Sequence, residues 1–134
     1  MKKARVCVVG MGIGRPNGQA ISRNKRGEVA ALCDIDEDRM KDFSKELPNE
    51  PKLYTDYKKM CKDKEIDAVF VGTPNQLHVP IALEAVKNGK HVLVTKPLSD
   101  SEVAARKLVE AAEAEGVVNM MSLSTRFEDD VQYL

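Results

Sequence analysis

The amino-acid sequence predicts an α/β fold, a doubly wound parallel sheet of about six strands with helices on both faces. Apolar runs of strand length alternate with helical patterns over all 134 residues, and short connections join them. The run 66–72 is apolar almost without interruption, as in strands that are covered on both faces. Parallel neighbours need crossover helices, so this alternation favours a parallel sheet within one domain.

The first strand, 6–9, ends in the glycine-rich loop Gly10-Met11-Gly12-Ile13-Gly14, and a helix follows. Such a loop presents free backbone N–H groups at the positive end of a helix, where a pyrophosphate binds. The third glycine of the GxGxxG pattern would fall at Arg15, so Gly14 or Gly18 must allow the close packing of the helix. Glycines also suit a tight turn for backbone reasons alone, which leaves a purely structural interpretation open.

An acidic residue at the end of the second strand favours a dinucleotide site. Asp34 follows the run 29–33, at about the distance from the glycines that the Rossmann fingerprint requires. A carboxylate there accepts hydrogen bonds from ribose hydroxyls and repels a 2′-phosphate, and Ile35 brings no positive charge. We therefore expect NAD in preference to NADP, with Arg39 able to soften that preference.

The remaining elements follow from helix signals and apolar runs. We expect helices at 16–25, from the cap Asp36 to Pro48, at 57–61, at 80–88, and from a capping box of Ser99 and Glu102 to Gly116. Strands are expected at 29–33, 52–54, 66–72, 91–95 and 117–121, with Met120 and Met121 in the core. We assign 1–122 to a dinucleotide-binding domain and 123–134 to the start of a connection.

Composition and charge argue against several classes of function. Basic and acidic residues both number 21, so neither a nucleic acid nor an anionic membrane is expected as the main partner. The N-terminus enters a strand without a signal-type apolar region, which predicts a cytoplasmic location. Cys7, Cys33 and Cys61 lack the spacing of metal ligands, so we expect no metal and interpret all three as small buried hydrophobes.

Polar segments follow most of the predicted strands, at the edge where an open α/β sheet binds its ligands. After the glycines and Asp34 come Thr73-Pro74-Asn75-Gln76-Leu77-His78, then Thr95-Lys96-Pro97, then Ser122–Arg126. Each has a plainer interpretation, since His78 could cap a helix, Lys96 could be a solvated lysine and Arg126 could neutralise a helix end. Their position on one edge of the sheet favours a ligand site.

These motifs resemble the glucose-fructose oxidoreductase and inositol dehydrogenase family, Gfo/Idh/MocA. The resemblance rests on the glycine loop, Cys33-Asp34-Ile35-Asp36, Thr73-Pro74-Asn75 with His78, and Val94-Thr95-Lys96-Pro97. It covers essentially the whole chain but only the family's N-terminal cofactor domain, so we expect these 134 residues to lack the family's C-terminal substrate domain. Family members are NAD(P)-dependent oxidoreductases that act mostly on sugars, inositols and related polyols.

The resemblance implies that the Thr73–His78 segment packs along the dinucleotide and that Lys96 reaches both nicotinamide ribose and substrate. Lys96 is therefore the candidate catalytic residue. Thr95 departs from the family pattern, which usually has a glutamate there. The remaining acid-base residues of the family come from the C-terminal domain. The candidate cofactor-binding residues are Gly10, Met11, Gly12, Ile13, Gly14, Asp34, Ile35, Arg39, Thr73, Pro74, Asn75, His78, Thr95, Lys96, Pro97 and Arg126.

The predicted function is hydride transfer between nicotinamide and a sugar, inositol or related polyol, in which the protein orients the substrate and handles a proton. A non-catalytic dinucleotide-binding fragment or sensor is the alternative. We also expect a homo-oligomer, because the apolar residues Val131, Tyr133 and Leu134 of the tail and the last sheet edge would lack cover. The 134-residue chain alone is expected to bind dinucleotide without efficient turnover.

Overall fold

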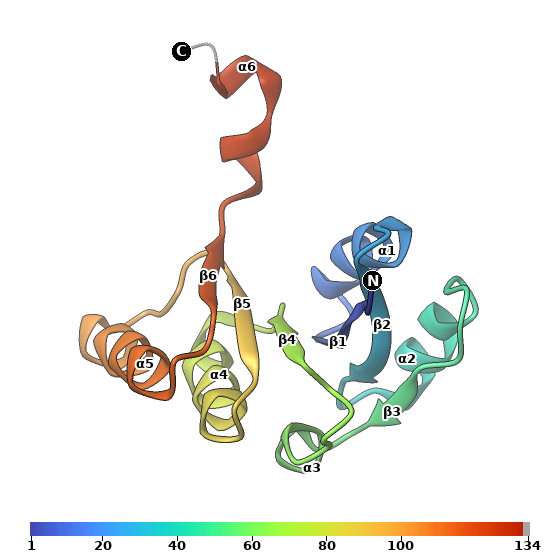
Figure 1. Ribbon diagram of the computed structural model, residues 1–134, viewed down its shortest axis with the longest axis horizontal. Coiled ribbons are helices and arrows are strands. Elements are labelled where there is room, and N and C mark those ends of the chain that lie inside the picture. Colours follow the sequence, from blue (N-terminus) through green and yellow to red (C-terminus); the bar gives the residue numbers. More distant parts are fainter. Residues whose placement is uncertain (133–134) are drawn as a thin grey trace.

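Six parallel strands form one sheet in the computed structural model, which describes residues 1–132 (Figure 1). The strands are β1 (Ala4–Val9), β2 (Gly27–Cys33), β3 (Lys52–Tyr54), β4 (Ala68–Val71), β5 (His91–Thr95) and β6 (Asn119–Ser122). Their order is β3-β2-β1-β4-β5-β6, and every neighbouring pair is parallel. The order reverses between β1 and β4, which is the switch point where such sheets bind ligands. The predicted doubly wound sheet is confirmed.

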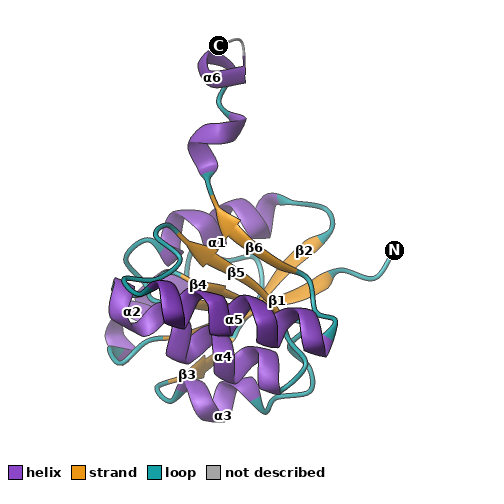
Figure 2. Ribbon diagram, turned by 90° about the vertical axis from the view of Figure 1, so that its left-hand side faces the viewer, coloured by secondary structure: helices purple, strands orange, loops and turns teal. Residues whose placement is uncertain are grey.

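Helices cover both faces of the sheet (Figures 1 and 2). They are α1 (Gly14–Arg23), α2 (Glu37–Ser44), α3 (Tyr57–Cys61), α4 (His78–Lys87), α5 (Glu102–Glu115) and α6 (Asp129–Gln132), with short 3₁₀ turns at Asn75–Leu77 and Ser124–Phe127. Helices α1 and α2 pack on one face through a cluster that includes Phe43 and Phe70. Helices α3, α4 and α5 pack on the other face through a cluster that includes Val71 and Val94. The predicted burial of the three cysteines is confirmed, and all three are free thiols.

Two glycines let α1 lie close to its neighbours. A Cβ on Gly14 would stand 2.7 Å from Cγ1 of Val8, and a Cβ on Gly18 would stand 2.8 Å from Cζ of Phe43. Both distances are shorter than real side-chain contacts, so both positions require glycine. The close packing expected of a third fingerprint glycine is thus shared by Gly14 and Gly18.

Arg15, which stands in place of that third glycine, points its side chain away from the sheet and onto α2. Its guanidinium pairs with Asp42 at 3.2 Å and with Glu46, and it lies 5.7 Å from the centroid of the Phe43 ring. Where the GxGxxG pattern has a packing glycine, this chain therefore has an arginine that forms a salt bridge to the neighbouring helix.

Several element boundaries differ from the prediction. Helices α1 and α4 each begin two residues earlier than predicted, so Pro16 and Pro80 are third residues of their helices. Proline is tolerated there because the first-turn N–H groups have no partner within the helix. The cap of α5 is Ser101 and not Ser99, because Ser101 precedes the helix directly and accepts a hydrogen bond from the N–H of Ala104 at 3.3 Å.

The edge strand β6 is less buried than predicted. Met120 and Met121 were both expected in the core, but Met120 is 50% exposed and Met121 is only half-buried, because β6 is the last strand of the sheet. Beyond β6, the 3₁₀ turn and α6 extend away from the body of the domain (Figure 2). Tyr133 and Leu134 of the predicted apolar tail lie outside the described residues, and so does the side chain of Val131. None of the helices in residues 1–132 has the length and apolar character that a bilayer crossing needs.

Candidate dinucleotide site

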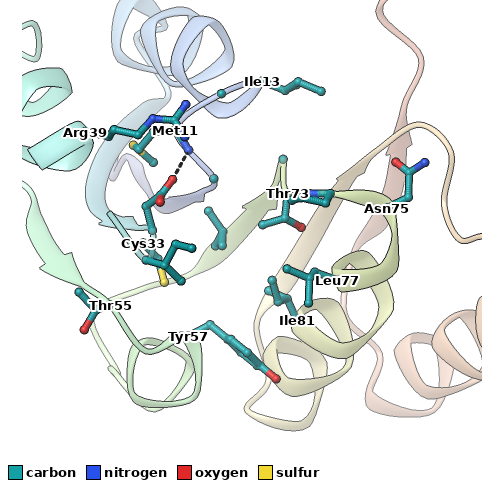
Figure 3. A pocket seen from close by; sticks show the side chains of 17 residues that line it. Met11, Ile13, Cys33, Arg39, Thr55, Tyr57, Thr73, Asn75, Leu77 and Ile81 are labelled. Carbon is teal, nitrogen blue, oxygen red and sulfur yellow. Dashed lines mark hydrogen bonds between the residues drawn. The ribbon is translucent and has the colours of Figure 1, made fainter. Parts of the chain in front are cut away.

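A cavity of about 680 Å³ opens at the carboxyl ends of β1, β2 and β4 (Figure 3). This volume lies within the usual range for small-molecule sites, roughly 300–1,000 Å³. Ten of the predicted cofactor-binding residues line it: Gly10, Met11, Gly12, Ile13, Asp34, Ile35, Arg39, Thr73, Pro74 and Asn75. The sheet order explains this, because the strands on either side of the switch point carry their loops to the same place.

The glycine loop forms the floor of the cavity through a close approach of two backbones. Gly10 has φ +88, and a Cβ on it would stand 2.6 Å from the carbonyl oxygen of Gly72, so only glycine fits. Beyond it, the N–H groups of Gly12 and Ile13 donate to no acceptor among the described residues. They stand directly before α1, whose N-terminus carries a partial positive charge. The loop is therefore suited to an anionic group such as a pyrophosphate.

Asp34 holds the glycine loop in place. One carboxylate oxygen accepts a hydrogen bond from the N–H of Met11 at 2.7 Å, shown as the dashed line in Figure 3, and the other accepts from the N–H of Asp36 at 2.9 Å. Asp36 in turn caps α2. Each carboxylate oxygen has a further lone pair, so Asp34 can also accept hydrogen bonds from a ligand hydroxyl.

Arg39 is the one guanidinium among the residues that line the cavity. It comes from α2 and reaches the glycine loop, where a Cβ on Gly12 would stand 3.7 Å from one of its terminal nitrogens. Ile35, on the same side, is 94% exposed. The β2 end of the cavity thus presents one carboxylate, one guanidinium and an apolar side chain to a ligand.

Thr73 contributes an unpaired polar atom to the cavity wall. Its Oγ1 is buried and has no hydrogen-bond partner in the part of the chain that the structure describes. A buried hydroxyl without a partner costs stability, which indicates that a ligand atom completes the site. The unpaired hydroxyl, the free N–H groups and the glycine floor all fit a dinucleotide.

Sequence reasoning missed residues that line the cavity beside and below the predicted ones. Thr55 and Tyr57 follow β3, whose carboxyl end lies at the same edge of the sheet as the predicted loops. Leu77, just before α4, and Ile81, within it, add apolar side chains to the cavity wall. Cys33 also lines the cavity. Burial, together with the nearby Cys61, raises the pKa of the Cys33 thiol to about 12, so it remains a neutral thiol and not a nucleophile.

Six predicted residues do not line the cavity: Gly14, His78, Thr95, Lys96, Pro97 and Arg126. Gly14 packs against Val8, and Thr95 is buried and donates to the carbonyl oxygen of Val71 at 3.2 Å. Lys96 is exposed on the loop after β5, next to the cavity along the sheet edge. Arg126 lies in the exposed 3₁₀ turn that extends away from the domain (Figure 2).

The chain belongs to the Gfo/Idh/MocA oxidoreductase family. The sequence model of this family, described as an oxidoreductase family with an NAD-binding Rossmann fold, matches residues 4–123. The predicted fold class and the resemblance to this family are thereby confirmed. The chain is an NAD-binding Rossmann domain.

Individual relatives are consistent with this assignment. A trans-1,2-dihydrobenzene-1,2-diol dehydrogenase from Xenopus laevis is 34% identical over 100 residues, which are 75% of this chain and 30% of that protein. An inositol 2-dehydrogenase from Salmonella typhimurium is 30% identical over 115 residues, 85% of this chain and 34% of that protein. The crystal structure of GenD2 from gentamicin A biosynthesis, in complex with NAD, is 28% identical with a TM-score of 0.90 over 96% of this chain and 37% of that chain. The chain thus spans about a third of the length of these relatives.

Replacing Thr73 tests whether its hydroxyl is reserved for a ligand. We expect Thr73→Val to raise the free energy of unfolding of the ligand-free chain by about 1 kcal/mol, because a buried unpaired hydroxyl is removed. The same change should weaken NAD binding about tenfold, since one hydrogen bond to the ligand is lost. Urea unfolding and titration calorimetry measure the two effects.

Thr125→Val, in the exposed turn after β6, is the matched control and should change neither quantity. A Thr73→Val chain that is less stable than the original, or that binds NAD equally well, would contradict the assignment.

Proposed function

We propose that this chain is the cofactor-binding domain of an NAD-dependent dehydrogenase that oxidises a CH–OH group of a sugar, an inositol or a related polyol. The observation that carries the proposal is the cavity at the switch point, with its free N–H groups and the unpaired Thr73 hydroxyl. The diol and inositol dehydrogenases among its relatives support the substrate class. In this chemistry the nicotinamide carries the hydride, and the protein binds, orients and exchanges protons.

The proposed orientation of the dinucleotide follows from the charges around the cavity. The N–H groups of Gly12 and Ile13 receive the pyrophosphate, and Asp34 accepts hydrogen bonds from the adenosine ribose. The other half of the molecule then extends from β1 toward β4 and β5. Thr73 and Asn75 lie along that half, and Lys96 lies beyond them.

Lys96 is the proposed catalytic residue of this domain. It is an exposed cation on the edge where the nicotinamide half would end, so it can anchor the substrate oxygen or relay its proton. The residue before Lys96 is Thr95 and not the glutamate of the family pattern, so it offers Lys96 no carboxylate. Thr95 is buried, and its hydroxyl donates to the main chain. We propose that residues 1–122 bind the cofactor and that 123–134 begin the connection toward the groups that hold the substrate.

Binding of both dinucleotides tests the proposal and the preference within it. We expect the chain to bind NAD and NADH, and to bind NADP more weakly, because Asp34 repels a 2′-phosphate. The guanidinium of Arg39, beside the glycine loop, can pair with a 2′-phosphate, so we expect weaker binding of NADP and not its exclusion. Asp34→Ala should narrow it, and Asp34→Asn, which keeps the shape without the charge, should do the same with less disturbance of the loop.

Titration calorimetry gives the affinities of the original chain and of both variants for NAD and for NADP. Tighter binding of NADP than of NAD by the original chain would reverse the proposed preference, and binding of neither would refute the proposed function.

Removing the lysine separates catalysis from binding. In any form of the protein that turns over a polyol, Lys96→Ala should lower kcat by several orders of magnitude and change NAD affinity by at most a few fold, since the interaction matters mainly in the transition state. Lys107→Ala, on the exposed surface of α5, is a matched control with unchanged kcat. Unaltered turnover after Lys96→Ala would show that Lys96 is only a solvated surface lysine.

The isolated chain is expected to bind dinucleotide, to turn over polyols poorly and to self-associate. A substrate carbon needs positioning groups on its far side, and without them most of the rate enhancement is lost. The outer edge of β6 pairs with no strand among residues 1–132, and beside it Val118 is 67% and Phe127 is 60% exposed. An unpaired edge with apolar neighbours favours pairing with another copy.

Light scattering over a range of concentrations tests the association, and a strict monomer at high concentration would contradict it. NADH formation with a panel of sugars and inositols tests the expected poor turnover. Robust turnover would mean that these residues alone hold a complete active site.

A further inference from the structure

His78 lies between the two loops that the proposed function places around the nicotinamide half of the dinucleotide. It is the first residue of α4 and is only 1% exposed, so it cannot contact a ligand in the cavity directly. We propose that His78 is a positioning residue that ties the cavity loop after β4 to the Lys96 loop after β5. The inference rests on the proposed function, because it concerns how Lys96 is presented to the cofactor.

Both ring nitrogens of His78 meet main-chain carbonyl oxygens. Nδ1 lies 2.7 Å from the carbonyl oxygen of Pro97, and Nε2 lies 2.9 Å from the carbonyl oxygen of Thr73. Oγ1 of Thr95 lies 3.3 Å from Nε2 and itself donates to the carbonyl oxygen of Val71. The imidazole therefore bridges one residue that lines the cavity and one residue that directly follows Lys96.

The chemistry of these contacts makes histidine specific at this position. A carbonyl oxygen only accepts, so the ring nitrogen that carries the proton donates to one of the two carbonyls. Nε2 also lies beside the Thr95 hydroxyl, which can donate either to it or to the carbonyl oxygen of Val71. The imidazole carries its two nitrogens at separate positions of one rigid ring and so reaches both loops, whereas an amide side chain ends in one nitrogen and one oxygen that lie close together. Glutamine or asparagine can hold one of the loops but not both, and an apolar ring holds neither.

No other main-chain link replaces this bridge. Strands β4 and β5 pair as far as Val71 and Val94. Beyond them, within residues 1–132, no backbone-to-backbone hydrogen bond joins 72–77 to 96–98. Beyond the strand ends and the bond from the Thr95 hydroxyl to Val71, His78 is thus the hydrogen-bonded link between the cavity wall at Thr73 and the loop of Lys96 within residues 1–132. Loss of the bridge frees the Lys96 loop while the glycine loop and Asp34, on the far side of the cavity, keep their own contacts.

Two ligands of different length separate this role from general stability. NADH spans the whole site, whereas ADP-ribose lacks the nicotinamide ring and depends on the glycine loop and Asp34. We expect His78→Phe to weaken NADH binding at least tenfold and to change ADP-ribose binding by less than threefold, in titration calorimetry with the 134-residue chain. His78→Gln, which retains one of the two hydrogen bonds, should weaken NADH binding by less than His78→Phe does.

His91 provides the matched control. It is exposed at the opposite end of β5, where Nδ1 accepts a hydrogen bond from the N–H of Val118 at 3.0 Å. His91→Gln should leave both affinities within twofold of the original. Thermal unfolding of each variant shows that the folded chain is compared in every case.

A second variant covers the case in which His78→Phe does not fold. His78→Gln is the smaller change, and with it alone we expect weaker NADH binding and an ADP-ribose affinity within threefold of the original. A folded His78→Gln chain that binds NADH as tightly as the original would overturn the two-sided bridge.

The binding outcomes are equally decisive. Equal losses of NADH and ADP-ribose affinity, or unchanged NADH affinity, would overturn the positioning role. If the original chain binds neither ligand, the proposed function itself fails, and this control distinguishes that result from a failure of the inference.

Discussion

The contact between the β1 and β4 backbones at the switch point is the constraint on which the site depends. The N–H of Gly72 donates to the carbonyl oxygen of Val9 at 2.8 Å, and a Cβ on Gly10 would collide with the Gly72 carbonyl. The two backbone segments are in contact here and then separate, the one after β1 toward α1 and the one after β4 toward α4 (Figure 1). The cavity lies in the space between the diverging loops, so it follows from the strand order and from two glycines that permit the contact.

Polar groups at this edge divide into those that hold the site and those left for a ligand. Asp34 and His78 are each bonded to two main-chain groups, and both fix the position of a loop. Thr73 Oγ1 and the N–H groups of Gly12 and Ile13 lack partners among the described residues and face the cavity or the start of α1. Buried polar groups are normally paired, so the Thr73 hydroxyl is an exception among the described residues, whereas the exposed N–H groups of Gly12 and Ile13 are open to solvent or to a ligand.

The chain corresponds to the NAD-binding part of its relatives. Its relatives share the Rossmann part over about a third of their length, and two of them carry names of dehydrogenases for a diol and an inositol. The groups that line the cavity suit features common to dinucleotides, a pyrophosphate and a ribose, and they say little about a polyol.

The sequence by itself determined the fold class, most of the cavity and its ligand class, because these depend on local patterns. Glycines at a strand end, an acid after the next strand and polar residues after β4 are recognisable without a structure, since each acts close to its own strand. Tertiary structure decided the rest. Whether His78 faces a ligand or two carbonyls depends on where Pro97 lies, and whether Met120 is buried depends on β6 being the last strand. Such features join residues far apart in the chain, and no local pattern encodes their distance.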